Sequence, residues 1–208
     1  MLSCMCERQN LIMINEKFVL VGALLNIIGS STYAWHTFKG KTKPNRVTWF
    51  LWALAPLIAF AAQLNEGVGL QVLMTFMVGF GPLMVFVASF LNRKAYWKIT
   101  RLDIVCGTLS VVALILWAIT GEGNIAIALS IAADLLAGVP TLIKAYKEPE
   151  TEHSDVFRNG ALSAGITLLT IKTWTFASYG FALYILLLCA TLYAVIRFKL
   201  GKRVLQAT

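Results

Sequence analysis

Charged residues are scarce in this chain. Asp, Glu, Lys and Arg make up 13% of its 208 residues, whereas about 25% is usual for a soluble domain. The hydrophobic fraction is 58% and the mean hydropathy is +0.73. This composition excludes a disordered chain, a basic tail that binds nucleic acid and an ordinary soluble enzyme. The net charge of +8 is more typical of the orientation signal of a membrane protein.

Side chains that carry common catalytic or metal chemistry are also few. The chain has two histidines, His36 and His153, and neither belongs to a cluster with metal-ligand spacing. No glycine-rich phosphate loop or serine-nucleophile motif is present. The four cysteines form no CxxC motif; they are Cys4, Cys6, Cys106 and Cys189. We therefore expect no metal, no cofactor and no enzymatic activity.

Long apolar runs, by contrast, fill most of the sequence. A helix that crosses a bilayer needs about 20 mostly apolar residues. Seven segments meet or approach this requirement: 18–37, 47–64, 69–91, 102–120, 124–144, 156–171 and 178–198. The first ten residues contain Glu7 and Arg8 and no apolar core, so no cleavable signal peptide is expected. The sequence therefore predicts an all-α integral membrane protein with seven transmembrane helices.

The positions of Lys and Arg predict how these helices are oriented. Fifteen of the 18 basic residues fall in alternate loops and the C-terminal tail, which leaves only Arg8, Lys17 and Lys172 for the other side. Basic loops face the cytoplasm. We therefore expect an external N-terminus, a cytoplasmic C-terminus and a place in the inner or plasma membrane.

The chain also contains a weak internal repeat. A shift of 108 positions lays segment 18–37 on segment 124–144, and Asn26 then falls on Asp134, each in the middle of its span. Two parallel three-helix units joined by one helix would produce this pattern, which is a transporter architecture. The expected organisation is an N-terminal segment 1–17, a first unit 18–91, a linker helix 92–123, a second unit 124–198 and a basic tail 199–208.

Two corresponding stretches carry a family resemblance. They are Thr32-Tyr33-Ala34-Trp35-His36-Thr37-Phe38-Lys39 and Pro140-Thr141-Leu142-Ile143-Lys144-Ala145-Tyr146-Lys147. Each resembles the Pro-Gln-x-x-(basic)-x-(aromatic)-Lys stretch of the SWEET/SemiSWEET sugar transporters and the PQ-loop family, although neither Gln is present and Thr32 stands in place of the first proline. The resemblance implies a 3 + 1 + 3 fold, alternating access and a sugar as the first substrate to consider. Nicotinamide riboside-type vitamin transporters share this fold type and give an alternative substrate.

Asp134 and Asn26 are the first candidates for a substrate site. Asp134 is the one acidic residue predicted at the centre of a span, where an ionisable group by default faces a cavity or a partner. Such a group could couple transport to protons. The structural alternative is a protonated Asp134 that joins helices through Asn26 or Ser130.

Four further residues complete the predicted binding set. Gln63 and Gln71 lie at outer helix ends, where they either line an extracellular mouth or reach the headgroups. Trp52 and Tyr184 lie deeper and are candidates to contact substrate. Trp35, Trp49 and Trp174 are interpreted as an interfacial aromatic belt.

The degenerate Pro-Gln positions predict a gate or hinge near the cytoplasmic face. These positions hold Thr32, Tyr33, Pro140 and Thr141. Pro140 removes a backbone hydrogen bond and is expected to bend its helix. The acidic run Glu148, Glu150, Glu152 and Asp155 is either a solvated face or a latch that pairs with the basic loop after segment 18–37.

The sequence thus favours an alternating-access transporter of a small polar solute that contacts lipid but no nucleic acid. Assembly into a homo-oligomer stays open. The alternative from a different class is a non-transporting heptahelical receptor or sensor, in which Asp134 would be sealed from water. A retinal protein is excluded because segment 178–198 lacks a lysine for the Schiff base.

Overall fold

The computed structural model describes residues 14–92, 98–120 and 122–202, and within them all regular structure is helical. Its seven α-helices overlap the seven segments expected from hydropathy. They are α1 (Val19–Phe38), α2 (Arg46–Asn65), α3 (Val72–Leu91), α4 (Arg101–Thr120), α5 (Gly123–Lys147), α6 (Ser154–Thr170) and α7 (Phe176–Arg197). Two short 3-10 helices, η1 (Glu16–Phe18) and η2 (Pro149–Thr151), precede α1 and α6. Cys4, Cys6, Arg8, Arg93, Lys94 and Arg203 lie outside the described residues.

Local sequence signals set several helix ends. The Asn45 side-chain oxygen accepts hydrogen bonds from the amides of Val47 and Thr48, at 3.1 and 3.4 Å, and so caps the start of α2. Gly40 and Gly67 follow the ends of α1 and α2 with φ of 70°, a left-handed conformation that glycine adopts without strain. Short polar connections therefore turn the chain between long apolar helices.

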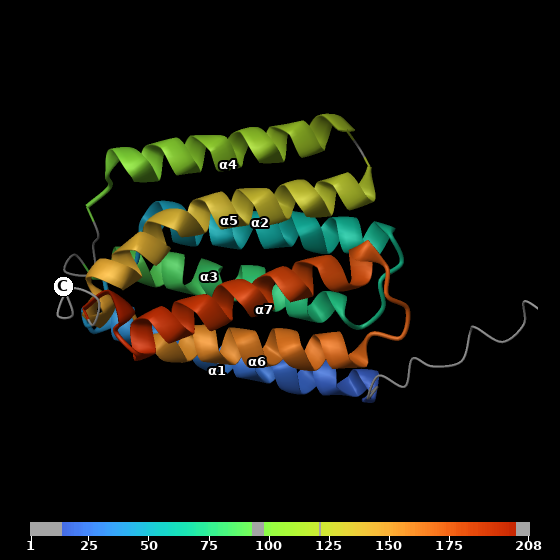
Figure 1. Ribbon diagram of the computed structural model, residues 1–208, viewed down its shortest axis with the longest axis horizontal. Helices are drawn as coiled ribbons and strands as arrows, with labels where there is room; N and C mark the ends of the chain where they lie inside the picture. Colours follow the sequence, from blue (N-terminus) through green and yellow to red (C-terminus); the bar gives the residue numbers. More distant parts are fainter. Residues whose placement is uncertain (1–13, 93–97, 121, 203–208) are drawn as a thin grey trace, which may run out of the picture.

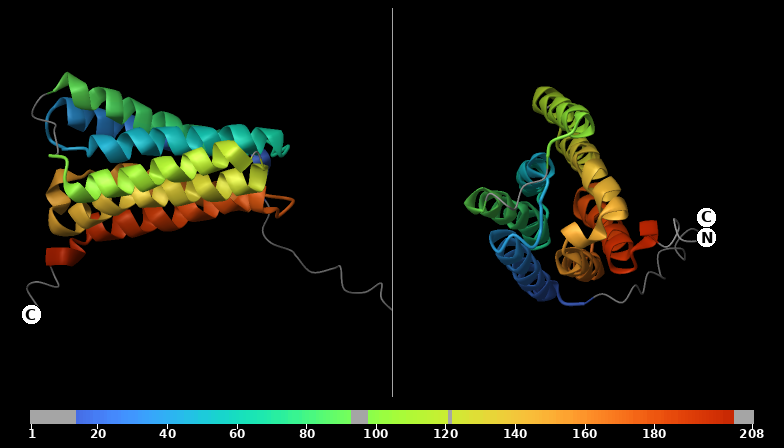
Figure 2. Two further views of the ribbon diagram at one scale, coloured as in Figure 1. Left: turned by 90° about the horizontal axis from the view of Figure 1, so that it is seen from above. Right: turned by 90° about the vertical axis from the view of Figure 1, so that its left-hand side faces the viewer.

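The helices lie roughly side by side along one axis (Figure 1). We call α1–α3 the first triplet and α5–α7 the second. In each triplet the third helix packs on both others: α3 contacts α1 and α2, and α7 contacts α5 and α6. The triplets meet where α1 packs on α6 and α2 on α5. Helix α4 packs mainly on α5 and stands at the edge of the bundle, as the end-on view shows (Figure 2).

Five of the helices are long and apolar enough to cross a membrane, namely α1 (extended by η1), α2, α3, α5 and α7. Helix α6 has only 17 residues and carries Asp155 and Arg158. Large apolar side chains such as Leu24, Phe90 and Leu187 point outward and are 57–61% exposed. An apolar outer surface of this kind suits lipid rather than water, so the structure indicates a multi-pass membrane protein.

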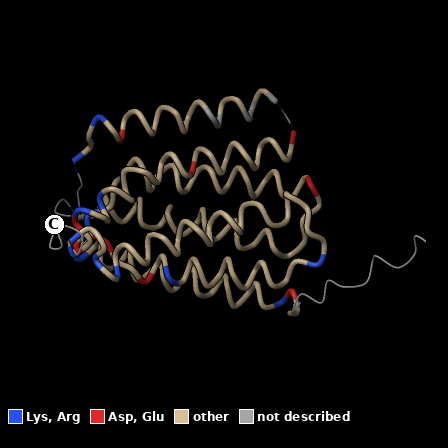
Figure 3. Tube along the Cα trace, in the orientation of Figure 1, with Lys and Arg blue, Asp and Glu red and all other residues tan. Residues whose placement is uncertain are grey.

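Most of the basic residues gather at one end of the bundle (Figure 3). We call the end where α1 finishes the basic end. Its described basic residues are Lys39, Lys41, Lys43, Arg46, Lys98, Arg101, Lys144, Lys147, Arg197, Lys199 and Lys202, with Arg158 one turn inside α6. At the opposite end, Lys17 and Lys172 are accompanied by Glu16, Glu66 and Glu122.

Two large apolar clusters and a small one, Ala55 with Ala133, fill the interior. The cluster nearer the basic end contains large rings, including Tyr33, Trp49, Trp52 and Phe157. The cluster nearer the opposite end is built mostly from alanines of α2, α5, α6 and α7 around Phe181.

Candidate functional site

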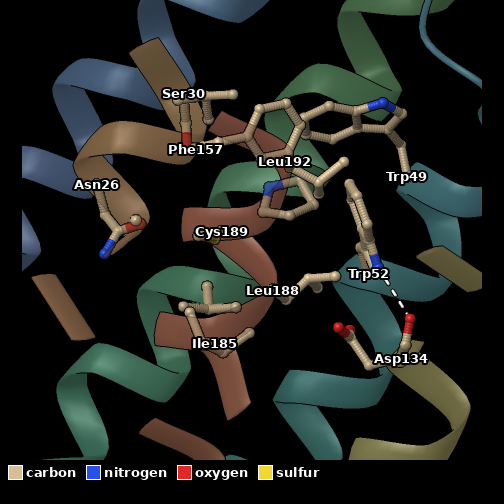
Figure 4. Close-up of a pocket in the computed structure, with 14 residues that line it drawn as sticks. Asn26, Ser30, Trp49, Trp52, Asp134, Phe157, Ile185, Leu188, Cys189 and Leu192 are labelled. Carbon is tan, nitrogen blue, oxygen red and sulfur yellow. Dashed lines mark hydrogen bonds between the residues drawn. The ribbon is translucent and has the colours of Figure 1, made fainter. Parts of the chain in front are cut away.

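A small cavity lies between the two triplets. All six triplet helices contribute to its lining: Asn26 and Ser30 from α1, Trp49 and Trp52 from α2, Val78 and Pro82 from α3, Asp134 from α5, Val156, Phe157 and Gly160 from α6, and Ile185, Leu188, Cys189 and Leu192 from α7. Its volume is about 50 Å³. Because one water needs about 10–15 Å³ measured in this way, the cavity has room for a few waters. Figure 4 shows how its side chains face one another.

Asp134 is the only charged side chain among these lining residues. It is 1% exposed, and its Oδ2 atom accepts a hydrogen bond of 2.7 Å from the Tyr184 hydroxyl. Its Oδ1 atom is buried and has no hydrogen-bond partner in the described part of the chain. The carboxyl group points into the cavity (Figure 4). An unpaired buried carboxyl oxygen is costly, so this atom is an open position for a ligand or water.

The partner of Asp134 differs from the structural alternative considered for the sequence. Tyr184, rather than Asn26 or Ser130, donates the bond. The Ser130 hydroxyl is itself buried without a partner among the described residues. Tyr184 comes from α7 of the same triplet, so this bond orients the carboxyl group and does not join the two triplets.

Three rings form one wall of the cavity. Trp49 and Trp52 pack edge to face with centroids 5.5 Å apart, and Trp52 and Phe157 do so at 6.2 Å. The Trp52 indole N–H donates to the Asp134 backbone carbonyl at 3.0 Å, which places this ring directly beside the acid. The Trp49 indole N–H is buried and has no partner among the described groups.

The aromatic-belt interpretation is therefore wrong for Trp49, which is 1% exposed and belongs to the interior. The reason is the cross-triplet contact of α2 with α5, which turns this face of α2 inward. Trp35 and Trp174 are exposed, as a belt requires. Trp35 also stacks on Phe38, and the Lys39 ammonium lies 4.6 Å from the centroid of the Trp35 ring.

Asn26 faces the cavity from the first triplet, across from Asp134 (Figure 4). Its amide nitrogen makes one long contact of 3.5 Å with the Gly22 carbonyl of its own helix. A contact of that length is at the limit of a hydrogen bond. The structure thus brings Asn26, Asp134, Trp52 and Tyr184 to one place, whereas Gln63 and Gln71 lie elsewhere.

Gln63 and Gln71 tie the triplets together at the opposite end. The Gln63 side-chain amide donates to the Ala177 carbonyl at 2.9 Å, and the Gln71 amide donates to the Thr170 carbonyl at 3.2 Å. Gln63 is buried and does not reach the headgroups. We call these two bonds, which join α2 and α3 to the ends of α7 and α6, the amide latch.

A second set of bonds closes the basic end. The Tyr33 hydroxyl of α1 donates to the Glu152 carboxylate at 2.5 Å, and Lys144 of α5 pairs with the same carboxylate at 2.6 Å. Lys144 also donates to the Lys43 carbonyl in the loop after α1. The Lys43 amide donates to the Thr151 carbonyl at 3.1 Å. Because Tyr33 and Lys43 belong to the first triplet and its loop, we call this set the ionic latch.

The acidic run is therefore divided between two roles. Glu152 pairs with Lys144 and Tyr33 rather than with the lysine side chains of the loop after α1. Glu150 is on the surface and pairs with Lys199 and Lys202 of the C-terminal segment, at 3.3 and 2.6 Å. Asp155 lies 3.2 Å from Arg158. The predicted pairing of this run with the basic loop after α1 is therefore not what these contacts show; Glu152 instead joins the two triplets through Tyr33.

The remaining gate candidates occupy separate positions. Tyr33 is fully buried within the ionic latch, and its ring centroid lies 4.6 Å from that of Trp49. Pro140 lies inside a continuous α5, and the hydroxyl of Thr141 next to it is buried without a partner in the described region. Thr32 bonds the Ile28 carbonyl of its own helix and takes no part in the latch.

The sequence patterns did not predict Phe157 as part of the site. They assigned Trp49 to an interfacial belt and did not single out Glu152 from the acidic run. A signal for the rings was present, because Trp49 and Phe157 stand 108 positions apart, the same separation as Asn26 and Asp134. Glu152 had no such signal, since burial of one acid from a run of four depends on packing.

No protein-family model, curated protein or solved structure matches the chain. Among the described residues, no group of three or more His, Cys, Asp or Glu side chains is placed to hold a metal ion.

Proposed function

We propose that this chain is a seven-helix transporter that carries a small polar solute across a membrane by alternating access. One observation carries the proposal: a buried carboxyl group with an unpaired oxygen faces a cavity that lies between two helix triplets, and both ends of that cavity are latched by bonds between the triplets. Rocking of one triplet against the other would open one end at a time.

Matched helix contacts support a two-fold relation between the triplets. At one crossing, the Thr48 hydroxyl of α2 donates to the Ala137 carbonyl of α5 at 2.8 Å. At the other, Gly29 of α1 lies so close to Val156 of α6 that an added Cβ atom would be 3.1 Å from its Cα atom. Gly29 and Ala137 are 108 positions apart, and so are Thr48 and Val156. In the proposed repeat, these pairs are equivalent residues at equivalent crossings.

The proposed membrane orientation follows from charge. The basic end would face the cytoplasm, which places the N-terminus outside. The ionic latch would then be the cytoplasmic gate and the amide latch the external gate. Helices α4 and α6 would complete the seven spans, with α4 as the linker between the units.

Counterflow in proteoliposomes tests the proposal. Labelled sugars, nucleosides, amino acids and small amines would be offered to wild type, Asp134→Asn and the exposed control Asp155→Asn, with and without an inward proton gradient. We expect exchange of at least one solute by wild type and the control, and a loss of tenfold or more in Asp134→Asn. A response to the gradient that disappears with Asp134 would add proton coupling.

Folded protein that exchanges no solute would contradict the transport proposal and favour the receptor alternative. The two are also separated by water access. A transporter must expose Asp134 at one stage of its cycle, so Asp134→Cys, in a background with the native cysteines replaced, should react with a water-soluble maleimide. A receptor with a sealed core leaves that cysteine unmodified.

A further inference from the structure

The central cavity has an unbalanced charge. Among the described residues that line it, Asp134 is acidic and none is Lys, Arg or His. The nearest basic residue along α5 is Lys144, which lies almost three turns away and is engaged by Glu152 and the Lys43 carbonyl. No counter-charge for Asp134 is therefore built into the site.

Neither protonation state of Asp134 is satisfied by the surrounding protein. An ionised carboxylate has one neutral donor, Tyr184, and no cation. A protonated carboxyl group would carry a hydrogen on the Oδ1 atom, which faces no acceptor. Because buried charges are normally paired and buried donors normally bonded, a ligand that brings a positive charge would complete the site.

The walls of the cavity suit an organic cation. Trp49, Trp52 and Phe157 all line the cavity, and their rings stand at 75–77° to one another across each contact. Aromatic faces attract ammonium groups, and this is how proteins recognise quaternary ammonium ligands. Trp52 is also held beside Asp134 by its bond to the Asp134 carbonyl.

Other ligand classes fit less well. A metal ion such as Ca²⁺ takes six to eight oxygen ligands, whereas the lining side chains offer the carboxylate, one amide and one hydroxyl, from Asp134, Asn26 and Ser30. An anion would be repelled by Asp134. An uncharged sugar would leave the carboxylate without a counter-charge.

We infer that Asp134, with Trp49, Trp52 and Phe157, forms a binding site for a small organic cation of the substituted-ammonium class. This inference rests on the proposed transport function, since it names the cargo of the same cavity. Asp134 supplies the charge, the rings supply the desolvated wall, and Tyr184 orients the carboxylate. The cavity of about 50 Å³ holds only a few waters as it stands, so a cation with the seven non-hydrogen atoms of choline requires the two triplets to separate slightly.

A pair of probes that differ only in charge tests the inference. Choline has a quaternary nitrogen, and 3,3-dimethyl-1-butanol has carbon at the same position. Each would be titrated into the full-length protein in nanodiscs, with binding followed by calorimetry and by the shift in thermal unfolding. We expect choline to bind at least tenfold more tightly than the alcohol.

Matched variants assign the effect to the site. Asp134→Asn keeps the shape of the side chain and is expected to abolish the preference for choline, whereas the exposed control Asp155→Asn keeps it. Trp49→Leu is expected to weaken choline binding by about twofold to thirtyfold, which is the range of a single cation–π contact. Trp35→Leu removes an exposed ring that lies outside the cavity and is expected to leave binding unchanged.

The result separates this inference from the proposed function. Equal binding of the two probes, no choline binding to folded wild type, or an unchanged preference in Asp134→Asn would overturn the cation site. Counterflow of an uncharged solute together with any of these results would leave transport standing. Charge-dependent binding of choline without counterflow of any solute would support the site and contradict transport.

Discussion

The amide of Lys43 donates a hydrogen bond to the carbonyl of Thr151 at 3.1 Å, and these two residues are 108 positions apart. In the proposed repeat they are equivalent residues, so the loops that follow α1 and α5 meet each other at the axis that would relate the triplets. A bond between equivalent residues closes the basic end at its centre.

Cross-linking the two loops should stop transport. With the native cysteines replaced, Lys43→Cys and Thr151→Cys together would be oxidised to hold the basic end shut. Counterflow is expected to fall at least tenfold and to recover on reduction. The control pair Phe38→Cys and Asn92→Cys joins α1 to the end of α3 within one triplet, where the Asn92 amide contacts the Phe38 carbonyl at 2.6 Å. That pair should leave counterflow unchanged, and equal inhibition by both pairs would contradict rocking between triplets.

The effects of Glu152 and Lys144 on the free energy of unfolding should be strongly coupled, because the two form the buried ion pair of the ionic latch. Glu152→Gln leaves the Lys144 ammonium buried without its opposite charge, and breaking one partner of such a pair typically costs about 3–5 kcal/mol. Adding Lys144→Met should restore most of the stability, because the uncompensated charge is then gone. Thermal unfolding of the two single variants and the double variant measures this coupling.

Glu150→Gln is the matched control for that experiment. Its carboxylate pairs with Lys199 and Lys202 at the same end of the bundle but in contact with solvent, where ion pairs contribute little. We expect almost no change in the unfolding temperature. Additive losses from Glu152→Gln and Lys144→Met would refute the coupling.

His153 should resist protonation. Burial lowers its pKa below the usual 6.5, and the neighbouring His36, whose ring centroid is 4.2 Å away, lowers it further. Asp155 acts in the other direction and Arg158 in the same direction as His36. Histidine NMR titrations should therefore give a higher pKa for His153 in His36→Gln and a still lower one in Asp155→Asn.

The same shift gives a pH dependence with a defined sign. The unfolded chain binds a proton at position 153 at a higher pH than the folded chain does. The contribution of neutral His153 to the free energy of unfolding is therefore fully present above pH 6.5. It is lost as pH falls through the lower pKa that His153 has in the folded state. His153→Gln should flatten this part of the stability profile, and an unchanged profile would contradict the assignment.

The hydroxyl of Tyr184 should matter for the site more than for the fold. Tyr184→Phe removes the one described side-chain bond to the Asp134 carboxyl group. Interhelical hydrogen bonds in membranes average about 0.6 kcal/mol, so the unfolding temperature should change little. Counterflow and choline affinity should fall severalfold because the carboxylate loses its orientation. Tyr193→Phe on the same helix is the control and should behave as wild type.

Two glycines of α6 provide a test of the cavity itself. A Cβ atom at Gly160 would lie 2.9 Å from the Cys189 sulfur, at the cavity wall, whereas at Gly165 the nearest atom is 3.9 Å away. Gly160→Leu should therefore block counterflow and Gly165→Leu should not. Equal activity of the two folded variants would show that the cavity is not on the transport path.

The sequence by itself determined the helices and the charge asymmetry. Seven apolar runs became seven helices, five of which are long and apolar enough to cross a membrane, since a stretch of about 20 apolar residues has few other structures that satisfy its backbone in lipid. The scarcity of acidic residues within apolar runs singled out Asp134, and the spacing of 108 residues paired it with Asn26, which lines the same cavity.

Tertiary structure alone decided what each polar side chain contacts. Trp49 lies in the interior rather than at the surface because α2 crosses α5. Gln63 and Gln71 latch the opposite end because the ends of α7 and α6 present carbonyls to them. Glu152 is buried while Glu150 stays exposed. Periodicity and hydropathy report whether a position favours lipid or water, but partners far apart in the sequence are chosen by helix packing.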